Sequence, residues 1–332
     1  MEVDFEMFEK NFMKKWSRTR KRHTDKAISP LVIWTEIFST IKGSAESHSF
    51  PNSGLPWKEY SKSNSKTNFL TIEEREWIYQ QYHIYEKWKN QNGYYDLMDL
   101  VNHILREIGV GYSGLPIHFL MCDEVQDLNS ATLKLFLKLT EQNVMFFGDT
   151  AQTIQRGVGF RFCDLRSLFY NRNSVNKREE IPNVQQLTVN FRSHNKILQV
   201  ANSIITAIEL FFPMNIDKLF KEKSNIDGLK PIVLKSELTS SVWALLFGYE
   251  GAKKEEEAGL IAKPVVEFGC DQVIIVRNQE SKNRLPSLLK HALCLTVYEA
   301  KGLEFDDVII FDFFEESPVP DAWRFLDFIE TQ

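Results

Sequence analysis

The sequence predicts an α/β fold, and two patterns lead to this prediction. Short apolar runs of strand length recur along the chain, and polar or charged residues follow each of them. Segments with apolar residues at helical spacing lie between these runs. The main predicted strands are 117–122, 144–147, 187–193, 273–276 and 308–311. Open α/β sheets bind ligands at the carboxyl ends of their strands, so the polar residues found there form the candidate site.

Composition limits the class of protein. The chain has 332 residues, of which 43% are hydrophobic, enough to bury two medium-sized cores. The formal net charge is −5, so contact with nucleic acid would need a local basic patch. The four cysteines lack metal-binding spacing, and we expect reduced thiols in a nuclear or cytoplasmic protein that is not secreted. We expect no membrane contact, because the acidic start is no signal peptide and no apolar run approaches ~20 residues.

The first seventy residues are expected to form a basic, helical segment and a loop. The basic run at 14–23 could contact phosphates or act as a nuclear address, and a solvated helix face is the alternative. Residues 42–68 are rich in Ser, Asn, Gly, Lys and Pro, which predicts an exposed loop.

Two amphipathic helices are predicted next. Thr71 and Glu74 have the spacing of a capping box, which begins a helix that ends at Gly93. Its large apolar residues recur at helical spacing, which favours core packing over base stacking: Trp77, Ile78, Tyr82, Tyr85 and Trp88. The second helix runs from about Asp96 to Gly109. It is expected to pack through Leu97, Leu100, Val101, Ile104, Leu105 and Ile108.

Further elements are expected toward the end of the chain. A helix is predicted over about 193–212, followed by a linker over 213–230. A short strand is predicted at 231–234 and an exposed helix at 250–263.

Asp123 and Glu124 follow the first predicted strand. Two carboxylates at the end of a buried strand are costly to desolvate unless they meet a cation or a reacting water. Asp123 could hold Mg²⁺ through water, and Glu124 could orient or deprotonate the water that attacks a nucleotide. The alternative is a surface loop whose acids cap the next helix. Gln126 and Asp127 could likewise couple the site to nucleic acid or cap that helix, and both interpretations stay open.

Gln152 and Arg192 follow two further predicted strands. The neutral amide of Gln152 could donate to a phosphate oxygen or orient water, and a polar turn is its alternative role. The guanidinium of Arg192 could reach the terminal phosphate of a nucleotide held on another domain, and so drive domain closure. A structural salt bridge is the alternative for Arg192.

Four segments in this order resemble the motifs of the UvrD/Rep-like superfamily 1 helicases, in particular the UvrD-like region of large TPR- and ankyrin-repeat proteins. They are the Walker B-like segment 123–127, the glutamine segment 148–152, the arginine segment 187–193 and the ribose-side segment 295–305. The resemblance covers about residues 90–312, and the residues before match vaguely. It implies ATP and Mg²⁺ as cofactors. It also implies 3′ to 5′ movement on single-stranded or duplex DNA, with RNA as a further possible substrate, and a link to DNA repair.

The resemblance also implies roles for residues of the second half. Glu304 would bond the ribose hydroxyl of the nucleotide, and Arg277 lies in a segment similar to the family's Tyr-Arg-Thr-Asn motif. Thr296 and Lys301 would meet the nucleic-acid backbone. Tyr298 stands where the family commonly has histidine, which is a departure from its pattern.

The segment after Gln152 is a looser match to the family. In it, Phe160 and Phe162 would stack on bases, and Arg161 would contact a phosphate.

The resemblance predicts two incomplete RecA-like P-loop NTPase lobes. Residues 1–70 would precede a first, ATP-binding lobe over 71–180 and a second lobe over 181–332 that has no 2B insertion. No glycine of this chain is followed by lysine, so a Walker A loop is missing, and the family's sixth motif is missing too. We therefore expect little or no ATP turnover by this chain alone. A larger chain or a partner would have to supply Walker A.

Two other functions remain as alternatives. One is a non-hydrolysing, helicase-derived module that binds nucleic acid or a protein partner. The other is an Mg²⁺ nuclease that uses Asp123, Glu124 and Asp127. The nuclease leaves the glutamine, arginine and Glu304 segments without a role.

Overall fold

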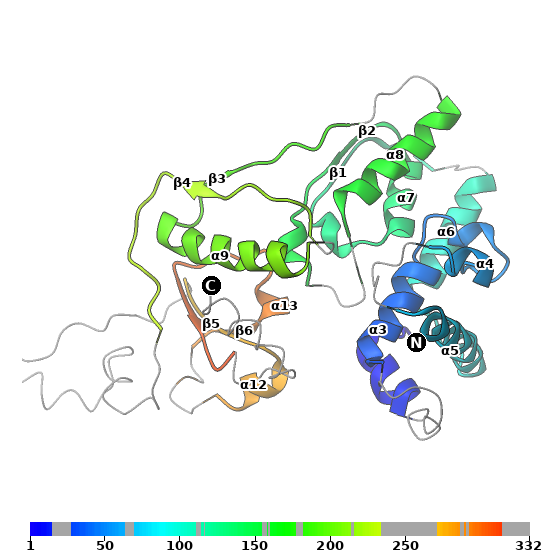
Figure 1. Cartoon of the computed structure of the whole chain (residues 1–332), viewed down its shortest axis with the longest axis horizontal. Helices are drawn as coiled ribbons and strands as arrows, with labels where there is room; N and C mark the ends of the chain where they lie inside the picture. The colour runs from blue at the N-terminus through cyan, green and yellow to red at the C-terminus, as the bar shows by residue number, and fades with distance from the viewer. Residues whose placement is uncertain are drawn as a thin grey trace, which may run out of the picture. The chain divides into compact units, whose positions relative to one another are not determined.

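The computed structural model describes the chain in two compact units, Met1–Asp227 and Gly228–Gln332 (Figure 1). The predicted lobe boundary at 180/181 stays a prediction. The described residues are 1–14, 28–63, 70–110, 114–115, 117–154, 158, 160–176, 182–213, 216–233, 271–285, 289 and 292–313. Most of the basic run at 14–23 and the whole segment 250–263 lie outside them.

The first unit begins with a helical layer. Its elements are α1 (Phe5–Met7), η1 (Phe8–Met13), α3 (Pro30–Thr35), η3 (Glu36–Ile41), η4 (Ser47–Ser49), α4 (Trp57–Tyr60), α5 (Ile72–Gln91) and α6 (Leu97–Val110). Aromatic side chains form its core. The ring of Phe8 lies 5.1 Å from that of Trp34 and 5.5 Å from that of Tyr85, centroid to centroid. Such contacts add about 0.5–1.5 kcal/mol per pair to the free energy of burial.

Helix α5 confirms the predicted capping box and aromatic core. The Thr71 hydroxyl accepts a hydrogen bond from the Glu74 amide (3.2 Å), and the Glu74 carboxylate accepts one from the Thr71 amide (2.8 Å). Tyr82 and Tyr85 are buried. Gly93 follows the helix with φ 64°, a conformation that favours glycine.

The prediction of an exposed loop over 42–68 is wrong for the described residues 42–63. Lys42, Ser47 and Tyr60 are fully buried, and Asn102 of α6 holds this segment in place. Composition misleads here, because polar residues can be buried when they are hydrogen-bonded.

Helix α6 has the predicted period but not the predicted buried face. Val101 and Leu105 are buried together with Met98, whereas the side chains of Leu97, Leu100 and Ile104 are exposed to solvent. A continuous apolar helix allows more than one face to be buried, and packing against α5 and α7 decides between them.

The candidate site lies in the second part of this unit. Its elements are β1 (Ile117–Cys122), η5 (Val125–Asp127), α7 (Ser130–Leu139), β2 (Thr140–Phe146), η6 (Thr150–Gln152) and α8 (Phe162–Asn176). Strands β1 and β2 are parallel, with Cys122 opposite Phe146. Helices α7 and α8 pack against each other on one face of the pair, and their core is formed by Val125, Leu133, Leu137, Leu165 and Leu168.

The two strands are present as predicted, but they are not buried on both faces. Phe119, Met121 and Met145 alternate with core residues and expose 46–63% of their surface. Parallel sheets are normally covered on both sides, so an exposed apolar face is unusual for a pair of this kind.

The last part of the first unit is β3 (Val189–Asn190), α9 (Asn195–Phe211) and β4 (Lys223–Ser224). The predicted helix is confirmed, and the predicted strand 187–193 is only two residues long. The expected linker instead contains β4, which pairs with β3 in parallel. Residues 231–233 have no regular structure, so the strand predicted there is wrong, and Leu234 lies outside the described residues.

The second unit contains a parallel sheet in the order β6-β5-β7. Its elements are β5 (Gln272–Val276), α12 (Gln279–Asn283), β6 (Cys294–Thr296), α13 (Val297–Ala300) and β7 (Asp307–Ile310). The predicted strands at 273–276 and 308–311 are confirmed. The chain therefore has the predicted α/β composition, with small parallel sheets in each unit. Among the helices that the structure describes, none is both long and apolar enough to cross a membrane.

Candidate functional site

The carboxyl ends of β1 and β2 meet at one edge of their sheet. Beyond the last strand residues, the Phe147 amide donates to the Cys122 carbonyl (2.8 Å), and the Val125 amide donates to the Phe147 carbonyl (3.0 Å). These two bonds bring the segments 123–127 and 148–152 together. Parallel pairing of neighbouring strands produces this convergence directly.

The buried side chain of Gln126 joins the two segments. Its Nε2 donates to Glu124 Oε2, and its Oε1 accepts from the Asp149 amide at 3.1 Å. Gly148 makes this approach possible, because a Cβ there would lie 2.5 Å from Gln126 Oε1 and 2.8 Å from Val125 Cγ2. The glycine is thus required by close packing.

Asp149 connects the bridge to Gln152. Its Oδ2 accepts from Gln152 Nε2 at 2.7 Å, and its Oδ1 accepts from the Ala151 amide at 2.9 Å. A second link runs from the Ile154 amide to Asp127 Oδ1 at 3.3 Å. Glu124, Gln126, Asp149 and Gln152 thereby form one hydrogen-bonded chain, which we call the Gln126 relay.

Glu124 has a left-handed backbone conformation, with φ 56° and ψ 36°. This region is uncommon outside glycine and costs about 1–3 kcal/mol, and such residues are concentrated at functional sites. The turn points the backbone away from the strand direction directly after Asp123, whose Oδ1 accepts from the Glu124 amide at 2.9 Å.

The carboxylates at this edge suit a magnesium ion chemically. Asp123 is exposed and Glu124 is half-buried, so an ion that keeps several of its waters can approach them. Mg²⁺ bound there would neutralise phosphate charge. The chain's own contribution would be to hold Asp123 toward the ion and Glu124 toward a water.

Arg192 lies in the same unit, beyond the short strand β3. The Asn190 side chain accepts hydrogen bonds from the amides of Arg192 (2.9 Å) and Ser193 (2.8 Å), which fixes the turn. The Arg192 side chain is exposed. Its predicted contact with a terminal phosphate stays a prediction.

The aromatic segment after Gln152 is packed into the protein. Phe160 is only 4% exposed, and its ring contacts that of Phe162 edge to face at 5.2 Å. Arg161 Nε lies 3.6 Å from Asp217 Oδ1. This packing supports a core role for Phe160 rather than base stacking, because a buried ring has no face to offer a base.

In the second unit, Arg277 and Thr296 end two adjacent strands. Arg277 Nε donates to the Phe313 carbonyl (2.9 Å), and its guanidinium carbon lies 4.4 Å from the centroid of the Phe313 ring. Thr296 is buried and caps α13, where its hydroxyl accepts from the Glu299 amide at 3.3 Å. Lys301 and Glu304 lie in the connection to β7, and Glu304 is exposed. The predicted roles of these residues stay predictions.

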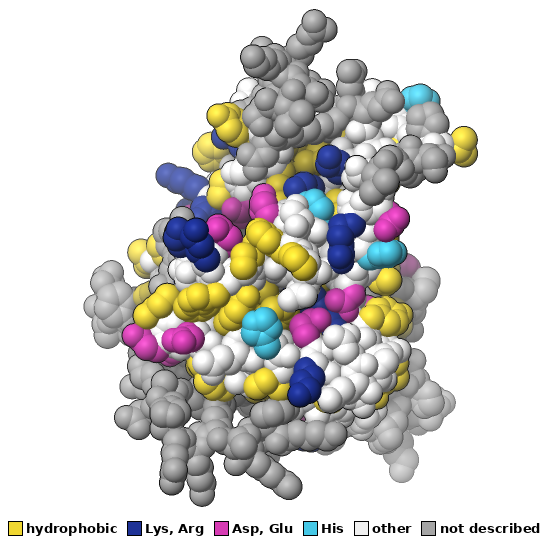
Figure 2. All heavy atoms as spheres, turned by 90° about the vertical axis from the view of Figure 1, so that its right-hand side faces the viewer, with side chains coloured by type: hydrophobic (Ala, Val, Ile, Leu, Met, Phe, Trp, Pro, Cys, Tyr) yellow, Lys and Arg dark blue, Asp and Glu magenta, His cyan; other side chains and the backbone are white. Residues whose placement is uncertain are grey.

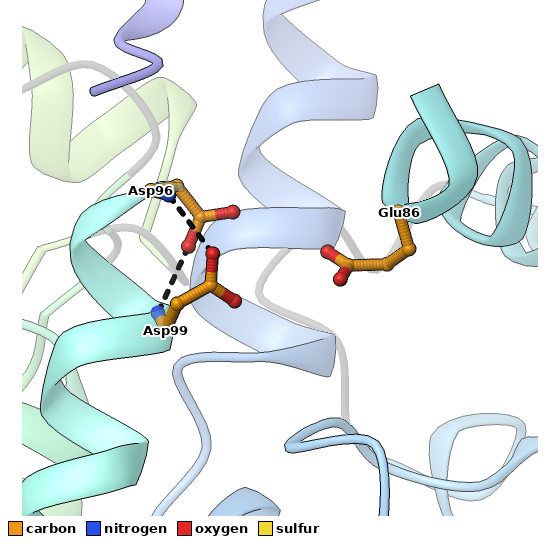
Figure 3. A group of neighbouring side chains, drawn as sticks. All are labelled: Glu86, Asp96 and Asp99. Atoms are coloured by element: carbon orange, nitrogen blue, oxygen red, sulfur yellow. Dashed lines mark hydrogen bonds between the residues drawn. The ribbon is translucent and has the colours of Figure 1, made fainter. Parts of the chain in front are cut away.

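A second group of carboxylates, Glu86, Asp96 and Asp99, lies in the helical layer (Figure 3). The spacing of their oxygens is that of a metal site. Two buried lysines occupy the space between them. Lys42 Nζ lies 2.6 Å from Asp96 Oδ2 and 2.6 Å from Asp99 Oδ1, and Lys89 Nζ lies 2.6 Å from Asp96 Oδ2. A metal would have to displace two ammonium groups, so this ion cluster does not fit one.

The ion cluster determines the ionisation of its members. Burial alone would lower the pKa of Lys42, but the carboxylates of Asp96, Glu86 and Asp99 outweigh it and hold the pKa well above its usual value. Burial likewise would raise the pKa of Asp96, but Lys42 and Lys89 lower it. Lys42 and Asp96 are therefore charged at neutral pH, and the cluster fastens α5 and α6 to the end of η3.

Comparison with known proteins supports the pattern of segments. Residues 4–175, just over half of the chain, match the UvrD/REP helicase N-terminal domain. The chain belongs to the UvrD/REP helicase family. It is also 38% identical over 333 residues to the human TPR and ankyrin repeat-containing protein 1. That alignment covers 98% of this chain but 11% of the human protein.

These matches confirm the predicted family resemblance and extend it. The motifs alone predict a resemblance that begins at about residue 90. The family match begins at residue 4, so it extends the resemblance into the first ninety residues, where the motifs alone give only a vague match.

Two features of the sites are missed by sequence reasoning. The Gln126 relay needs the register of β1 and β2, which residue spacing does not give. For the ion cluster one signal is present: Lys89 follows Tyr82 and Tyr85 on the buried face of α5, which places a cation in the core. A buried lysine requires acidic partners nearby.

Proposed function

We propose that the chain is the core of a UvrD-type, ATP-dependent DNA helicase or translocase, with the Gln126 relay at its nucleotide site. In this proposal Asp123 holds Mg²⁺, Glu124 activates the attacking water, and Gln152 contacts the terminal phosphate of ATP. The relay is the observation that supports it. It connects the residue that would contact phosphate to the residue that would act as base.

Arg192 and the second unit complete the proposal. Arg192 would contact the terminal phosphate, while Glu304 and Arg277 would bind the nucleotide from the second RecA-like lobe. Arg161, Phe162, Thr296 and Lys301 would contact the nucleic acid. The family implies 3′ to 5′ movement on DNA and a link to DNA repair, which would place the activity in the nucleus or the cytoplasm.

The proposal requires a phosphate loop that is not part of this sequence. A Walker A segment, supplied by a larger chain or a partner, would hold the β- and γ-phosphates with its amides and lysine. We expect the chain by itself to turn over little or no ATP.

A non-hydrolysing module that binds nucleic acid or a protein partner is the second candidate. One observation favours it: groups proposed to meet nucleotide are already bonded within the protein. Gln152 donates to Asp149, and Arg277 donates to the Phe313 carbonyl. These bonds engage one N–H group of each side chain within the protein.

ATP hydrolysis distinguishes the two candidates. The assay uses a longer polypeptide that joins a Walker A segment to this chain, with and without single-stranded DNA. We expect DNA-stimulated turnover that Glu124→Gln reduces by about 10²–10⁴-fold and Arg192→Ala by about 10³–10⁵-fold. Lys58→Gln, an exposed substitution on α4, is the matched control and should retain wild-type turnover. If the longer polypeptide does not hydrolyse ATP, or if both variants retain full ATP hydrolysis, the hydrolase is ruled out and the binding module is favoured.

A further inference from the structure

Four basic side chains from three separate elements gather on the first unit. They are His48 of η4, Arg106 of α6, and Lys134 and Lys138 of α7, and we call them the basic rim. Figure 2 shows dark blue and cyan side chains near one another on the face of the molecule that it draws, with magenta side chains among them. The net charge of the chain is −5, so this local concentration of positive charge is not a property of the whole surface.

The fold assembles the basic rim by docking the segment 43–53 between two helices. On the α6 side, Asn102 Nδ2 donates to the carbonyls of Lys42 (2.9 Å) and Ser53 (3.3 Å). One turn further along α6, the Arg106 guanidinium donates to Ser53 Oγ. These bonds fix Arg106 beside the docked segment.

On the α7 side, two hydrogen bonds hold the same segment. The Ala131 amide donates to the Gly43 carbonyl (2.8 Å), and Lys134 Nζ donates to the Ala45 carbonyl (2.9 Å). Lys138 lies four residues after Lys134, so both lysines share one face of the helix. His48 therefore lies between cations on both sides.

Like charges crowd at the basic rim. Burial lowers the pKa of His48, and the positive charges of Lys134, Lys138 and Arg106 lower it further. Burial and Lys138 also lower the pKa of Lys134, while Glu46 opposes them. Among the described residues, Arg106, Lys134 and Lys138 form no ion pair with a carboxylate.

Arg106, Lys134 and Lys138 bring positive charge together around the docked segment, and Glu46 opposes it only at Lys134. A local excess of positive charge is the feature of a surface that meets an anion.

We propose that the basic rim binds the phosphate backbone of a nucleic-acid strand. The proposal adds a contact surface to the proposed function and rests on it for the choice of nucleic acid as the anion. Lysine, arginine and histidine side chains are the usual phosphate contacts of such proteins, and they carry affinity without reading sequence. The contacts lie on α6, α7 and the segment between them, and none of the four residues belongs to the Gln126 relay.

Salt-dependent binding of a strand tests the proposal. Fluorescence anisotropy would follow a fluorescein-labelled oligothymidine titrated with the full chain, without nucleotide, at several salt concentrations. Each phosphate contact to a single strand contributes about 0.7 to the slope of log affinity against log salt. We expect Lys138→Gln and Lys134→Gln each to reduce that slope by about 0.7. The difference in affinity from wild type should then shrink by about 2.5-fold for every fourfold rise in salt.

Matched variants separate a contact from a general charge effect. Lys58→Gln removes the same charge from the exposed surface of α4 and should leave the slope unchanged. Lys138 is exposed and forms no side-chain hydrogen bond within the described residues, so its substitution also leaves the fold intact. Equal slopes for wild type and both rim variants would overturn the proposal. So would an equal loss in Lys58→Gln, or failure of the wild-type chain to bind the strand at low salt.

Two further measurements identify the anion and show whether the basic rim or the proposed function is at fault. The first is competition by polyglutamate, compared with unlabelled strand at equal charge. If both displace the oligothymidine equally well, the basic rim is a general polyanion surface, and the assignment to nucleic acid is overturned. ATP turnover is measured separately, on the longer polypeptide that carries a Walker A segment. Absent turnover there, together with the expected rim slopes for this chain, would reject the proposed function alone.

Discussion

The first unit contains two groups of carboxylates, and they are held in opposite ways. In the ion cluster, Asp96 meets two buried lysines at 2.6 Å. At the strand ends, Asp123 and Asp149 accept hydrogen bonds from backbone amides and from the amide side chain of Gln152. Lysine cancels negative charge, whereas an amide orients a carboxylate and leaves its charge in place. The first group therefore stabilises the fold, and the second retains the charge that a cation or a reacting water needs.

Substitution of Asp96 should produce the largest change in stability. Asp96→Asn leaves Lys42 and Lys89 buried with one charge fewer to balance them. We expect the free energy of unfolding to fall by about 3–5 kcal/mol. Urea denaturation followed by circular dichroism measures it. Asp99→Asn is the matched control with a smaller loss, because that side chain is 30% exposed. Equal losses in the two variants would contradict the buried character of the ion cluster.

The ion cluster should also make stability depend on pH. The pKa of Asp96 is lowered on folding from 3.8, so its contribution is present above about pH 3.8 and is lost as the pH falls through the folded value. The pKa of Lys42 is raised above 10.5, so its contribution is present below about pH 10.5 and is lost as the pH rises through the folded value. Melting temperatures measured across this range should show a plateau between the two limits. In Asp96→Asn, the loss of stability at low pH should be smaller by the part that Asp96 contributes.

Gly148→Ala tests the packing at the strand ends. The added methyl would meet Gln126 Oε1 and Val125 Cγ2 closer than atoms normally approach. We expect a loss of about 1–3 kcal/mol, the usual effect of overpacking, and separation of Asp149 from Gln126. Thermal denaturation measures the loss. Gly109→Ala, where no atom lies within 4 Å of the added methyl, is the control and should not lower the melting temperature. A Gly148→Ala protein as stable as wild type would show that the relay is loosely packed.

Asp149→Ala should have the smallest effect on stability. It removes the side-chain acceptor for the Ala151 amide at the start of η6, a loss of about 0.5–2 kcal/mol. Chemical denaturation of Asp149→Ala beside Asp96→Asn gives the comparison directly. A loss as large as that of Asp96→Asn would mean that the strand-end carboxylates are structural, contrary to the distinction drawn above.

Sequence patterns predict the parts of this protein that depend on local chemistry. The capping box at Thr71 and the order of polar strand ends were readable, since both follow from neighbouring residues and from the period of a helix or strand. The burial of Lys42 was not, because its three acidic partners come from α5 and α6, more than forty residues away. The exposed face of β1 and β2 was missed for the related reason that alternation in a strand does not say whether a second layer is present.

For the candidate site, residue types predicted that the segments 123–127 and 148–152 lie at strand ends, but not the connections between them. Glu124 and Gln152 were identified from their positions after strands, while the bridge through Gln126 depends on the register that places Cys122 opposite Phe146. Phe160 illustrates the converse. An aromatic residue in a matching segment predicts stacking, yet the cluster of α7 and α8 buries its ring.

The bare side of β1 and β2 has a practical consequence for work with the purified chain. Phe119, Met121 and Met145 form an exposed apolar strip, and two molecules can bury it by associating through this face. Self-association should therefore increase with protein concentration, and sedimentation would detect it. Met121→Lys should reduce this self-association and should not disturb the packing on the opposite face of the strand pair.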